Sequence, residues 1–471
     1  MPPAQTFSNL QANQVASFFV AQIGTFRRYF AEGATGAFFD TSIALLNATG
    51  QPATATVRFQ REDGQEFSQT VQMGGLSRAT VDPETLAGLA AAAFSTVIES
   101  TQPIIADRKM RWDGSGYGSH AETSVAEPLT TWYLAEGATT GGFNLFYLLQ
   151  NPTAQAATVQ IQYLRPAPAA PITKTYTVGA NTRRSIYVNG EDPLLDEAEI
   201  SAVIASTNAV PIVVERAMYL NSNGQLFGAG HESAAVADLS TSWFFAEGAT
   251  GPFFNMFILV ANPSATDAAL ELRYLLPSGQ VITRTHVARA HSRLTIGVHD
   301  EALDLARTPV STTLQSTNGV AVLAERAMWW PSVALVPQWQ EGHNSAGAVR
   351  TGEKWGLADG EEGGAGDNQT YVLVANTSAT PGSVQVTAIF EDGTTAQLPS
   401  PVSLAANSRT TLAMRQVFPG AVGRRFGIIV ESVGANPAQI VVERAMYSDA
   451  VINGSAVVWA AGTNVVGTRL R

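Results

Sequence analysis

The sequence predicts an all-β protein: four tandem Ig-like antiparallel β-sandwich domains in an elongated rod, preceded by an N-terminal β-strand arm. Three observations support this prediction. Two motifs repeat in step along the chain, and the runs between them alternate apolar and polar residues with a period of two. Turn residues also recur at the roughly 8–12-residue spacing that is typical of β-sandwiches.

The first repeated motif is a strand-like run in which an acid and an arginine stand side by side. VVERAMY occurs at 213–219 and again at 441–447, with looser copies LAERAMW at 323–329 and IADRKMRW at 105–112. Because this motif recurs at intervals of roughly 110 residues, the sequence indicates four copies of one unit.

The second repeated motif opens each unit. It reads RYFAEGATG at 28–36, WYLAEGATT at 132–140, WFFAEGATG at 243–251 and, in degenerate form, KWGLADGEE at 354–362. The two motifs together divide the chain into an arm at 1–24 and repeats at 25–127, 128–239, 240–350 and 351–471.

Repeat 3 shows the strand pattern most clearly. Its apolar runs last a few residues each and end in Asn-Pro, Pro-Ser-Gly or Asn-Gly turns. The predicted strands lie within 254–264, 268–279, 281–288, 292–298, 312–319 and 321–330. With the opening motif and the strand after 330, each repeat has the seven or eight short strands expected of an Ig-like sandwich.

The composition excludes several classes of partner. The chain carries 28 basic and 39 acidic residues, a net charge of −11, so neither nucleic acid nor an anionic membrane is an expected partner. The most apolar stretch, at 86–98, is too short and too rich in small residues to insert into a membrane. There is no cysteine, so neither disulfides nor thiolate metal sites are expected.

Charged residues make up only 14% of the chain, against about 25% in an ordinary soluble protein. A weakly charged surface favours packing against copies of the same chain or against a solid surface. Self-association is therefore the expected partnership.

The Glu-Arg pair is predicted to be structural. Neighbouring side chains in a strand leave on opposite faces, so Glu215 and Arg216 need different partners. Each repeat offers a second acid in its opening motif and a second arginine near its fifth strand. We expect two cross-strand ion pairs within each sandwich, formed by Glu32, Arg78, Asp107, Arg108; Glu136, Arg183, Glu215, Arg216; Glu247, Arg293, Glu325, Arg326; and Asp359, Arg409, Glu443, Arg444. A catalytic acid/base set is the alternative interpretation, but no nucleophile recurs beside these charges.

Several histidines and one acidic loop are further candidates for a site, and each also has a structural interpretation. His120, His231 and His343 occupy one position in three repeats, with Trp459 expected there in the fourth, and are predicted to close the last hairpin by a hydrogen bond. His286, His291 and His299 occur only in repeat 3 and do not obviously converge on a metal. The acidic loop at 359–369 has calcium-like composition without calcium-loop spacing.

Aromatic residues gather on one hairpin of repeat 3, namely Trp329, Trp330 and Trp339. Exposed rings at such a place stack on sugars or bury themselves in a partner protein. The competing interpretation is packing across the joint between two domains. Both alternatives predict a contact of some kind.

The N-terminal arm suggests a mode of assembly. VASFFVAQIG at 15–24 matches 231–240, the final strand of a preceding repeat, although no repeat precedes it here. We expect the arm, with Phe18 and Phe19 as contacts, to add a strand to the last sandwich of a neighbouring copy.

These motifs resemble tandem repeats of large bacterial secreted or surface proteins. The resemblance rests on W-[YF]-[LF]-A-E-G-[AS]-T, on the Asn-Pro turn and on V-E-R-A-M-[YW] followed by G-H-x-S, and it covers the chain from about Tyr29 onward. It implies an Ig-like sandwich in an extracellular or cell-surface setting. Repeat 4 departs from the pattern at Asp359 and at the missing histidine.

The sequence therefore predicts a non-enzymatic structural repeat protein that assembles head-to-tail into a filament or stalk. No Walker loop, nucleophile elbow, zinc-protease motif or dinucleotide fingerprint is present, so no catalytic residue, cofactor or metal ligand is predicted. The first rival is an adhesin or carbohydrate-binding module that contacts surface glycans through the aromatic residues of repeat 3. The second rival is an accessory region of a larger enzyme.

Overall fold

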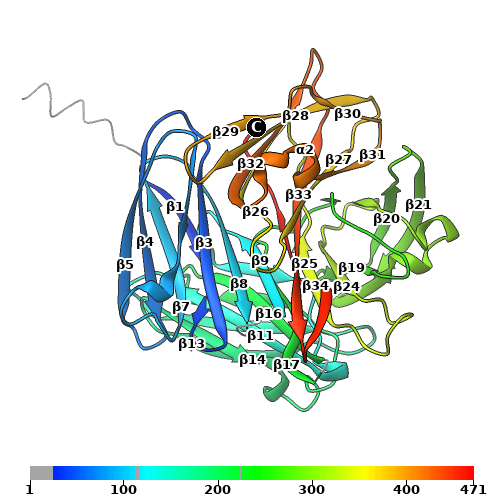
Figure 1. Ribbon diagram of the computed structural model, residues 1–471. Helices are drawn as coiled ribbons and strands as arrows, with labels where there is room; N and C mark the ends of the chain where they lie inside the picture. Colours follow the sequence, from blue (N-terminus) through cyan, green and yellow to red (C-terminus); the bar gives the residue numbers. More distant parts are fainter. Residues whose placement is uncertain (1–24, 113–116, 223) are drawn as a thin grey trace, which may run out of the picture.

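The computed structural model describes residues 25–112, 117–222 and 224–471 (Figure 1). Within these residues almost every element is an antiparallel strand, and the strands form eight sheets that pack face to face in four sandwiches. The all-β sandwich fold class is thus confirmed. The predicted arm, with Phe18 and Phe19, lies outside the described residues. Within the described residues, no helix has the length and apolar character needed to cross a membrane.

Each sandwich has one inner and one outer sheet, and the inner sheet contains the Glu-Arg strand. In sandwich 1 the outer sheet is β1 (Phe26–Phe30), β7 (Ala92–Ser100), β4 (Ala53–Arg61) and β5 (Glu66–Met73), with β2 (Ala34–Thr35) beside β7. Its inner sheet is β6 (Ser77–Val81), β3 (Phe39–Asn47), β8 (Ile105–Trp112) and β9 (Gly118–Thr123).

Sandwiches 2 and 3 repeat this strand order. In sandwich 2 the outer sheet is β10 (Thr131–Leu134), β15 (Ser201–Ser206), β12 (Ala157–Leu164) and β13 (Ile172–Val178), and the inner sheet is β14 (Thr182–Tyr187), β11 (Phe143–Asn151), β16 (Val213–Ser222) and β17 (Gln225–Ala234). In sandwich 3 the outer sheet is β18 (Ser242–Phe245), β23 (Ser311–Ser316), β20 (Ala268–Leu275) and β21 (Val281–Ala288), and the inner sheet is β22 (Ser292–Gly297), β19 (Asn255–Asn262), β24 (Leu323–Trp330) and β25 (Glu341–Ala346).

Sandwich 4 keeps the same plan with small additions. Its outer sheet is β29 (Thr395–Gln397), β30 (Val402–Leu404), β28 (Gly382–Phe390), β32 (Arg424–Val433), β26 (Lys354–Glu362) and β35 (Thr468–Arg469). Its inner sheet is β31 (Ser408–Ala413), β27 (Gln369–Asn376), β33 (Ile440–Ile452) and β34 (Ser455–Val466). The helical turns in the described part of the chain are short: Pro83–Thr85, Thr140–Gly142, Val188–Gly190, Val298–Asp300, Leu303–Leu305, α2 (Met414–Val417) and Pro419–Ala421.

Burial along the strands explains the sequence pattern. Outer strands such as β4 alternate buried and half-buried residues, because one face packs on the core and the other faces solvent. The inner strands β16 and β24 are instead buried at nearly every position. A second layer must therefore cover the face of each inner sheet that turns away from its own sandwich.

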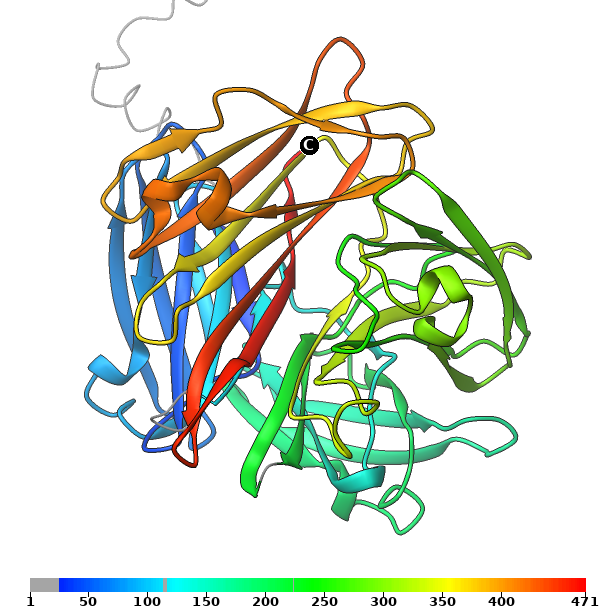
Figure 2. The same ribbon diagram turned by 45° about the vertical axis from the view of Figure 1, so that its right-hand side comes forward.

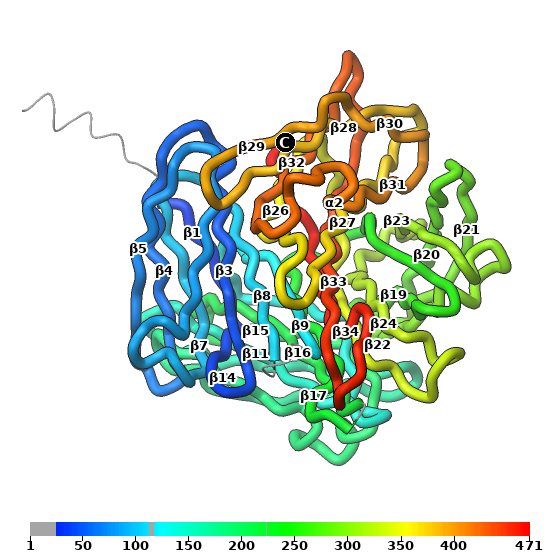
Figure 3. The backbone as a smooth tube through the Cα atoms, in the orientation of Figure 1, coloured from blue at the N-terminus to red at the C-terminus, as the bar shows by residue number. Residues whose placement is uncertain are grey.

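That second layer is the neighbouring sandwich. The four last inner strands pack on one another, β9 against β17 and β34, and β25 against β17 and β34. The sandwiches surround this centre, and sandwich 4, in orange and red, lies beside sandwich 1, in blue (Figure 2). The backbone trace in Figure 3 follows the same order around the molecule.

The predicted elongated rod is therefore wrong. β8 of sandwich 1 contacts β26 of sandwich 4, so the first and last repeats meet and close a ring. One buried apolar cluster extends through sandwiches 2 and 3, and another combines residues of sandwiches 1, 2 and 4. Short connections favour this closure, because each sandwich can bury a second sheet face by turning back on its neighbours.

Candidate functional site

The Glu-Arg strands form a buried ring of charges between the sandwiches. In sandwich 2, Glu215 faces sandwich 1 and accepts from Arg108 (Oε2 to Nη1, 2.6 Å). Its neighbour Arg216 faces sandwich 3 and donates to Glu325 (Nη1 to Oε2, 2.8 Å). Both residues are fully buried. Adjacent side chains of one strand thus serve opposite interfaces, as the strand geometry requires.

The pattern continues around the molecule. Arg326 of sandwich 3 donates to Glu443 of sandwich 4 (Nη1 to Oε2, 3.1 Å). Arg444 of sandwich 4 departs from this pattern, because it lies 3.9 Å from Asp359 of its own sandwich (Nη2 to Oδ2) and donates to Thr463 of the same sandwich. Each acid also accepts a backbone N–H from the opening motif of the preceding sandwich: Glu32 N to Glu215, Ala135 N to Glu325, Ala246 N to Glu443, and Ala358 N to Asp107.

The arginines on the edge strands β6, β14, β22 and β31 of the inner sheets also bind groups of a neighbouring sandwich. Arg183 donates to Gly33 O (2.9 Å) in sandwich 1, and Arg293 donates to Gly137 O (2.7 Å) in sandwich 2. Arg409 pairs with Glu247 in sandwich 3 (3.1 Å), and Arg78 pairs with Asp359 in sandwich 4 (3.0 Å).

The expectation of ion pairs within one sandwich is therefore corrected. Two contacts do stay within one sandwich, Arg108 with Glu32 at 3.4 Å in sandwich 1 and Arg444 with Asp359 at 3.9 Å in sandwich 4, but the other named pairs join neighbouring sandwiches. The physical reason is burial. A charged pair at the shared face of two sandwiches loses water on both sides, so it must be satisfied by the other sandwich.

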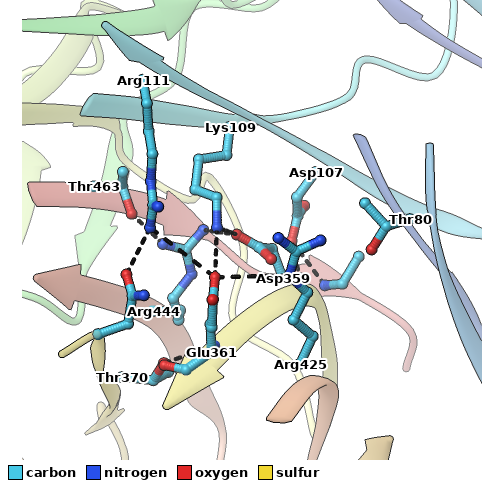
Figure 4. Close-up of polar contacts among 12 residues, drawn as sticks. Thr80, Asp107, Lys109, Arg111, Asp359, Glu361, Thr370, Arg425, Arg444 and Thr463 are labelled. Atoms are coloured by element: carbon cyan, nitrogen blue, oxygen red, sulfur yellow. Dashed lines mark hydrogen bonds and ion pairs between the residues drawn. The ribbon is translucent and has the colours of Figure 1, made fainter. Parts of the chain in front are cut away.

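The closing seam between sandwiches 4 and 1 explains the two degenerate motifs. Where other repeats have Ala and an aromatic residue, β8 carries Lys109 and Arg111. Lys109 Nζ lies 3.1 Å from Glu361 Oε2 and 3.6 Å from Asp359 Oδ2. Figure 4 shows Lys109 pointing toward both carboxylates of the altered opening motif, while Arg111 donates to Asn368 (2.7 Å). The basic residues that break the motif in repeat 1 thus lie against the acidic residues that break the motif in repeat 4.

The acidic loop at 359–369 uses its carboxylates in the same way. Glu362 accepts from Arg415 (2.8 Å) and from the backbone of Thr370 (2.9 Å), and Asp367 also accepts from Arg415 (2.9 Å). Arg415 therefore supplies positive charge to two carboxylates of this loop.

His120 and His343 form hydrogen bonds between sandwiches and do not close their own hairpins, which corrects their predicted role. His120 Nε2 lies 3.1 Å from the hydroxyl of Tyr219 in sandwich 2, and His343 Nε2 lies 3.3 Å from that of Tyr447 in sandwich 4. Strand register places Thr463 opposite Met446, so the fourth copy has threonine there and not Trp459.

The three histidines that occur only in repeat 3, His286, His291 and His299, do not meet in a cluster. His286 lies 2.9 Å from Glu301 Oε2, whereas His299 lies near Asn255 and Asp300. His291 has a positive φ of 50° in a turn.

A tight cluster of possible metal ligands does occur elsewhere, at Glu32, His120 and Glu232. The guanidinium of Arg108 already supplies the positive charge there, because Nη2 lies 2.5 Å from Glu232 Oε2 and 3.4 Å from Glu32 Oε2. This arrangement fits a buried ion network and does not fit a metal centre.

Burial shifts the pKa values of the central carboxyl groups. It raises the pKa of Glu32 to about 7, against the opposing effect of Arg108. It raises the pKa of Glu122 to about 8 and that of Glu232 well above its usual range. Burial lowers the pKa values of the aligned histidines His120, His231 and His343 well below theirs.

These shifts predict that folding stability falls as the pH rises from about 6.5 to 8. Carboxyl groups with raised folded pKa values stabilise the fold fully below their unfolded pKa of about 4.5, and that contribution is lost as the pH rises through their folded values of about 7 and 8. Histidines with depressed folded pKa values act oppositely, but only below their unfolded pKa of about 6.5, where stability is lost as the pH falls. Melting temperatures should therefore decrease between pH 6.5 and pH 9. A flat profile in that range would contradict the assignment.

Glu341 is a central residue that sequence reasoning missed. Its carboxylate is buried and accepts backbone N–H groups from Ser119 (3.3 Å), Gly230 (3.0 Å) and Gly342 (2.8 Å), with Gly462 as a fourth donor. One donor comes from each sandwich, so a single carboxylate occupies the common centre. The equivalent positions in the other repeats are Gly118, Ala229 and Ala461.

The aromatic residues of repeat 3 pack at joints. Trp330 is 1% exposed, packs on Tyr447 with ring centroids 5.4 Å apart, and donates to Trp459 O (2.8 Å). Trp329 is 3% exposed, and Trp339 stacks on it at 5.6 Å. Of the two alternatives that the sequence leaves open, the structure shows packing across joints for Trp329 and Trp330, because neighbouring sandwiches cover both rings.

Comparisons with known proteins add little to this geometry. No family model matches the chain, and no curated protein matches it. The crystal structure of Thermotoga maritima 1070 is similar to 24% of this chain over 96% of its own length, with 12% identity and a TM-score of 0.21. The Anabaena sensory rhodopsin transducer matches 20% of this chain over 91% of its own, with 25% identity and a TM-score of 0.17.

A third solved structure is a tetra-tandem repeat from the extending region of a large adhesion protein. It covers 89% of this chain and 92% of its own, with 12% identity and a TM-score of 0.11. All three TM-scores are low, so conclusions on function rest on the residues of this chain.

Proposed function

We propose that this chain is a non-enzymatic structural protein of the bacterial cell surface or extracellular space, and that its four sandwiches act as one rigid unit. The observation that carries the proposal is the use of the repeated charges. Most of the recurring acids and arginines bind groups of a neighbouring sandwich, as in the pair of Arg216 and Glu325. Charges committed to buried contacts of this kind favour a scaffold over a catalytic site.

Assembly into a filament through the N-terminal arm is part of the proposal. The sheet that accepts the arm differs, however, from the one expected from the sequence. The last sandwich was expected to receive the arm of another copy, but β34 packs between β9 and β25, and β35 already pairs with β26. Free edges lie instead on the outer sheets, where β5, β13 and β21 each pair on one side only. Strand addition at one of these edges is the proposed contact between copies.

Deletion of residues 1–24 tests this assembly. The full chain should sediment as a polymer and appear as filaments by negative-stain microscopy, whereas a chain of residues 25–471 should sediment as a monomer with unchanged circular dichroism. A full chain that stays monomeric, or a truncated chain that still polymerises, would contradict the role of the arm.

Glycan binding through exposed aromatic residues is not part of this proposal. Its basis in repeat 3 is lost because Trp329 and Trp330 are buried at joints.

A further inference from the structure

A cavity of about 380 Å³ lies between sandwiches 2 and 3. Its volume falls within the range of about 300–1,000 Å³ that small-ligand pockets occupy. Aromatic side chains form much of its wall. Trp329 and Trp339 stack with an interplanar angle of 26°, Phe143 meets the edge of Trp329 at 5.1 Å, and Phe257 meets Trp339 at 5.8 Å.

One residue distinguishes this interface from its equivalents. Strand register places Trp329 where sandwich 2 has Tyr219 and sandwich 4 has Tyr447. Tyr219 satisfies two buried groups of sandwich 1, because its hydroxyl lies 3.1 Å from His120 Nε2 and donates to Glu32 Oε1 (3.4 Å). A tryptophan has no hydroxyl to offer at this place.

The groups that would have met that hydroxyl are left without partners. Neither ring nitrogen of His231 forms a hydrogen bond with the described residues, and the same holds for Oε2 of Glu136, which lines the cavity. The acids equivalent to Glu136 all form ion pairs: Glu32 with Arg108, Glu247 with Arg409, and Asp359 with Arg78. Within the described residues Glu136 forms none, although it is only 6% exposed.

The charges around the cavity favour a cation. Glu136 and Glu199 are the carboxylates of its lining, and Arg293 is the only lining cation among the described residues. Arg293 Nη1 donates to Gly137 O (2.7 Å) and lies 3.7 Å from Glu199 Oε2, so its charge is already shared. A buried carboxylate without a partner is costly, and a cation that arrives in the cavity relieves that cost.

We propose that this cavity binds a small organic cation, with its ammonium or amidinium group against Glu136 and its apolar body against Trp329 and Trp339. Aromatic faces attract such cations through their negative π clouds, which adds to the ion pair. This site goes beyond the structural role proposed above and does not depend on it, because a monomeric chain offers the same cavity.

Calorimetric titration of the full chain with three matched probes tests the charge requirement. Phenethylammonium should bind in the millimolar range or tighter. The neutral 2-phenylethanol should bind at least tenfold more weakly, and the anionic 3-phenylpropionate should not bind. Equal affinity for the ammonium and the alcohol would overturn the proposal and indicate an apolar cavity only.

Substitutions locate the binding group. Glu136→Gln keeps the shape of the side chain and should weaken phenethylammonium binding at least tenfold, whereas Glu32→Gln, at the equivalent but filled interface, should leave it unchanged. Trp329→Tyr restores the hydroxyl found in two other sandwiches, so it should abolish binding while the melting temperature stays the same or rises. Full affinity in Glu136→Gln would overturn the proposal, as would full affinity in Trp329→Tyr.

The pH dependence gives a further readout. Burial raises the pKa of Glu136 to about 7, with Arg293, Arg216, Glu325 and Glu199 as the charged groups around it. A cation binds the ionised carboxylate, so affinity should rise about tenfold between pH 6 and pH 8. This rise should be absent in Glu136→Gln. An affinity that is flat with pH in the unsubstituted chain would contradict the assignment to this carboxylate.

Discussion

Arg108→Met is expected to cause the largest loss of stability of any single substitution in the charged ring. Arg108 is fully buried and lies within ion-pair distance of Glu215 (2.6 Å), Glu232 (2.5 Å) and Glu32 (3.4 Å). Methionine removes an arginine that these three acids share, and orphaned buried charges typically cost about 3–5 kcal/mol. Urea denaturation of the variant and the unsubstituted chain measures this loss.

The loss should depend on pH in a defined direction. Without Arg108, the pKa values of Glu32 and Glu232, which burial already raises, should rise further. A carboxyl group with a raised folded pKa stabilises the fold below its unfolded pKa, and that stabilisation is lost as the pH rises. The deficit of Arg108→Met should therefore be smaller at pH 5 than at pH 8.

Arg326→Met provides the matched control at the interface between sandwiches 3 and 4. Arg326 lies within ion-pair distance of one carboxylate, Glu443, and also donates to the neutral Asn464 (2.9 Å). Its loss should destabilise the ring with a weaker dependence on pH. Equal pH profiles for the two variants, or a negligible loss in Arg108→Met, would contradict the shared ion network.

The strands and the repeat were predictable because both depend on local signals. The period-two pattern of β4 and the turn residues after each run are read from neighbouring residues, and they specify strands whatever the sandwiches do next. The opposite orientation of Glu215 and Arg216 likewise follows from strand geometry alone.

The partners of those charges were not predictable from one repeat. Two acids and two arginines per repeat balance equally well within a sandwich or between sandwiches, and only ring closure decides between the two. One sequence signal did point to closure. Lys109 and Arg111 break the motif of repeat 1, Asp359 and Glu361 break the motif of repeat 4, and these opposite charges meet at the closing seam.

The histidine position shows how a local irregularity misleads alignment. β33 has a register shift between Ser448 and Ala450, and its hairpin with β34 extends further than those of the other sandwiches. Counting from the motif therefore placed Trp459 at the position that Thr463 occupies. The cavity between sandwiches 2 and 3 was also not predictable from the sequence, because the role of Trp329 depends on the unpartnered Glu136 of sandwich 2, which lines the same cavity.

Glu341→Ala is expected to destabilise the centre of the ring by about 3 kcal/mol or more. Glu341 supplies the acceptor for N–H groups of Ser119, Gly230, Gly342 and Gly462, so alanine leaves four buried donors unsatisfied. Each such donor costs about 1–3 kcal/mol where water does not replace the acceptor. Thermal denaturation compares the variant with the unsubstituted chain.

Chemical rescue separates this effect from simple loss of packing. The vacated centre keeps four converging N–H groups, an arrangement that binds small anions. Formate should therefore raise the melting temperature of Glu341→Ala in a concentration-dependent way and leave that of the unsubstituted chain unchanged. Glu341→Gln should be intermediate in stability and insensitive to formate, because its amide fills the space and offers one acceptor oxygen. A variant that is as stable as the parent, or that formate does not stabilise, would show that the four N–H groups do not depend on Glu341.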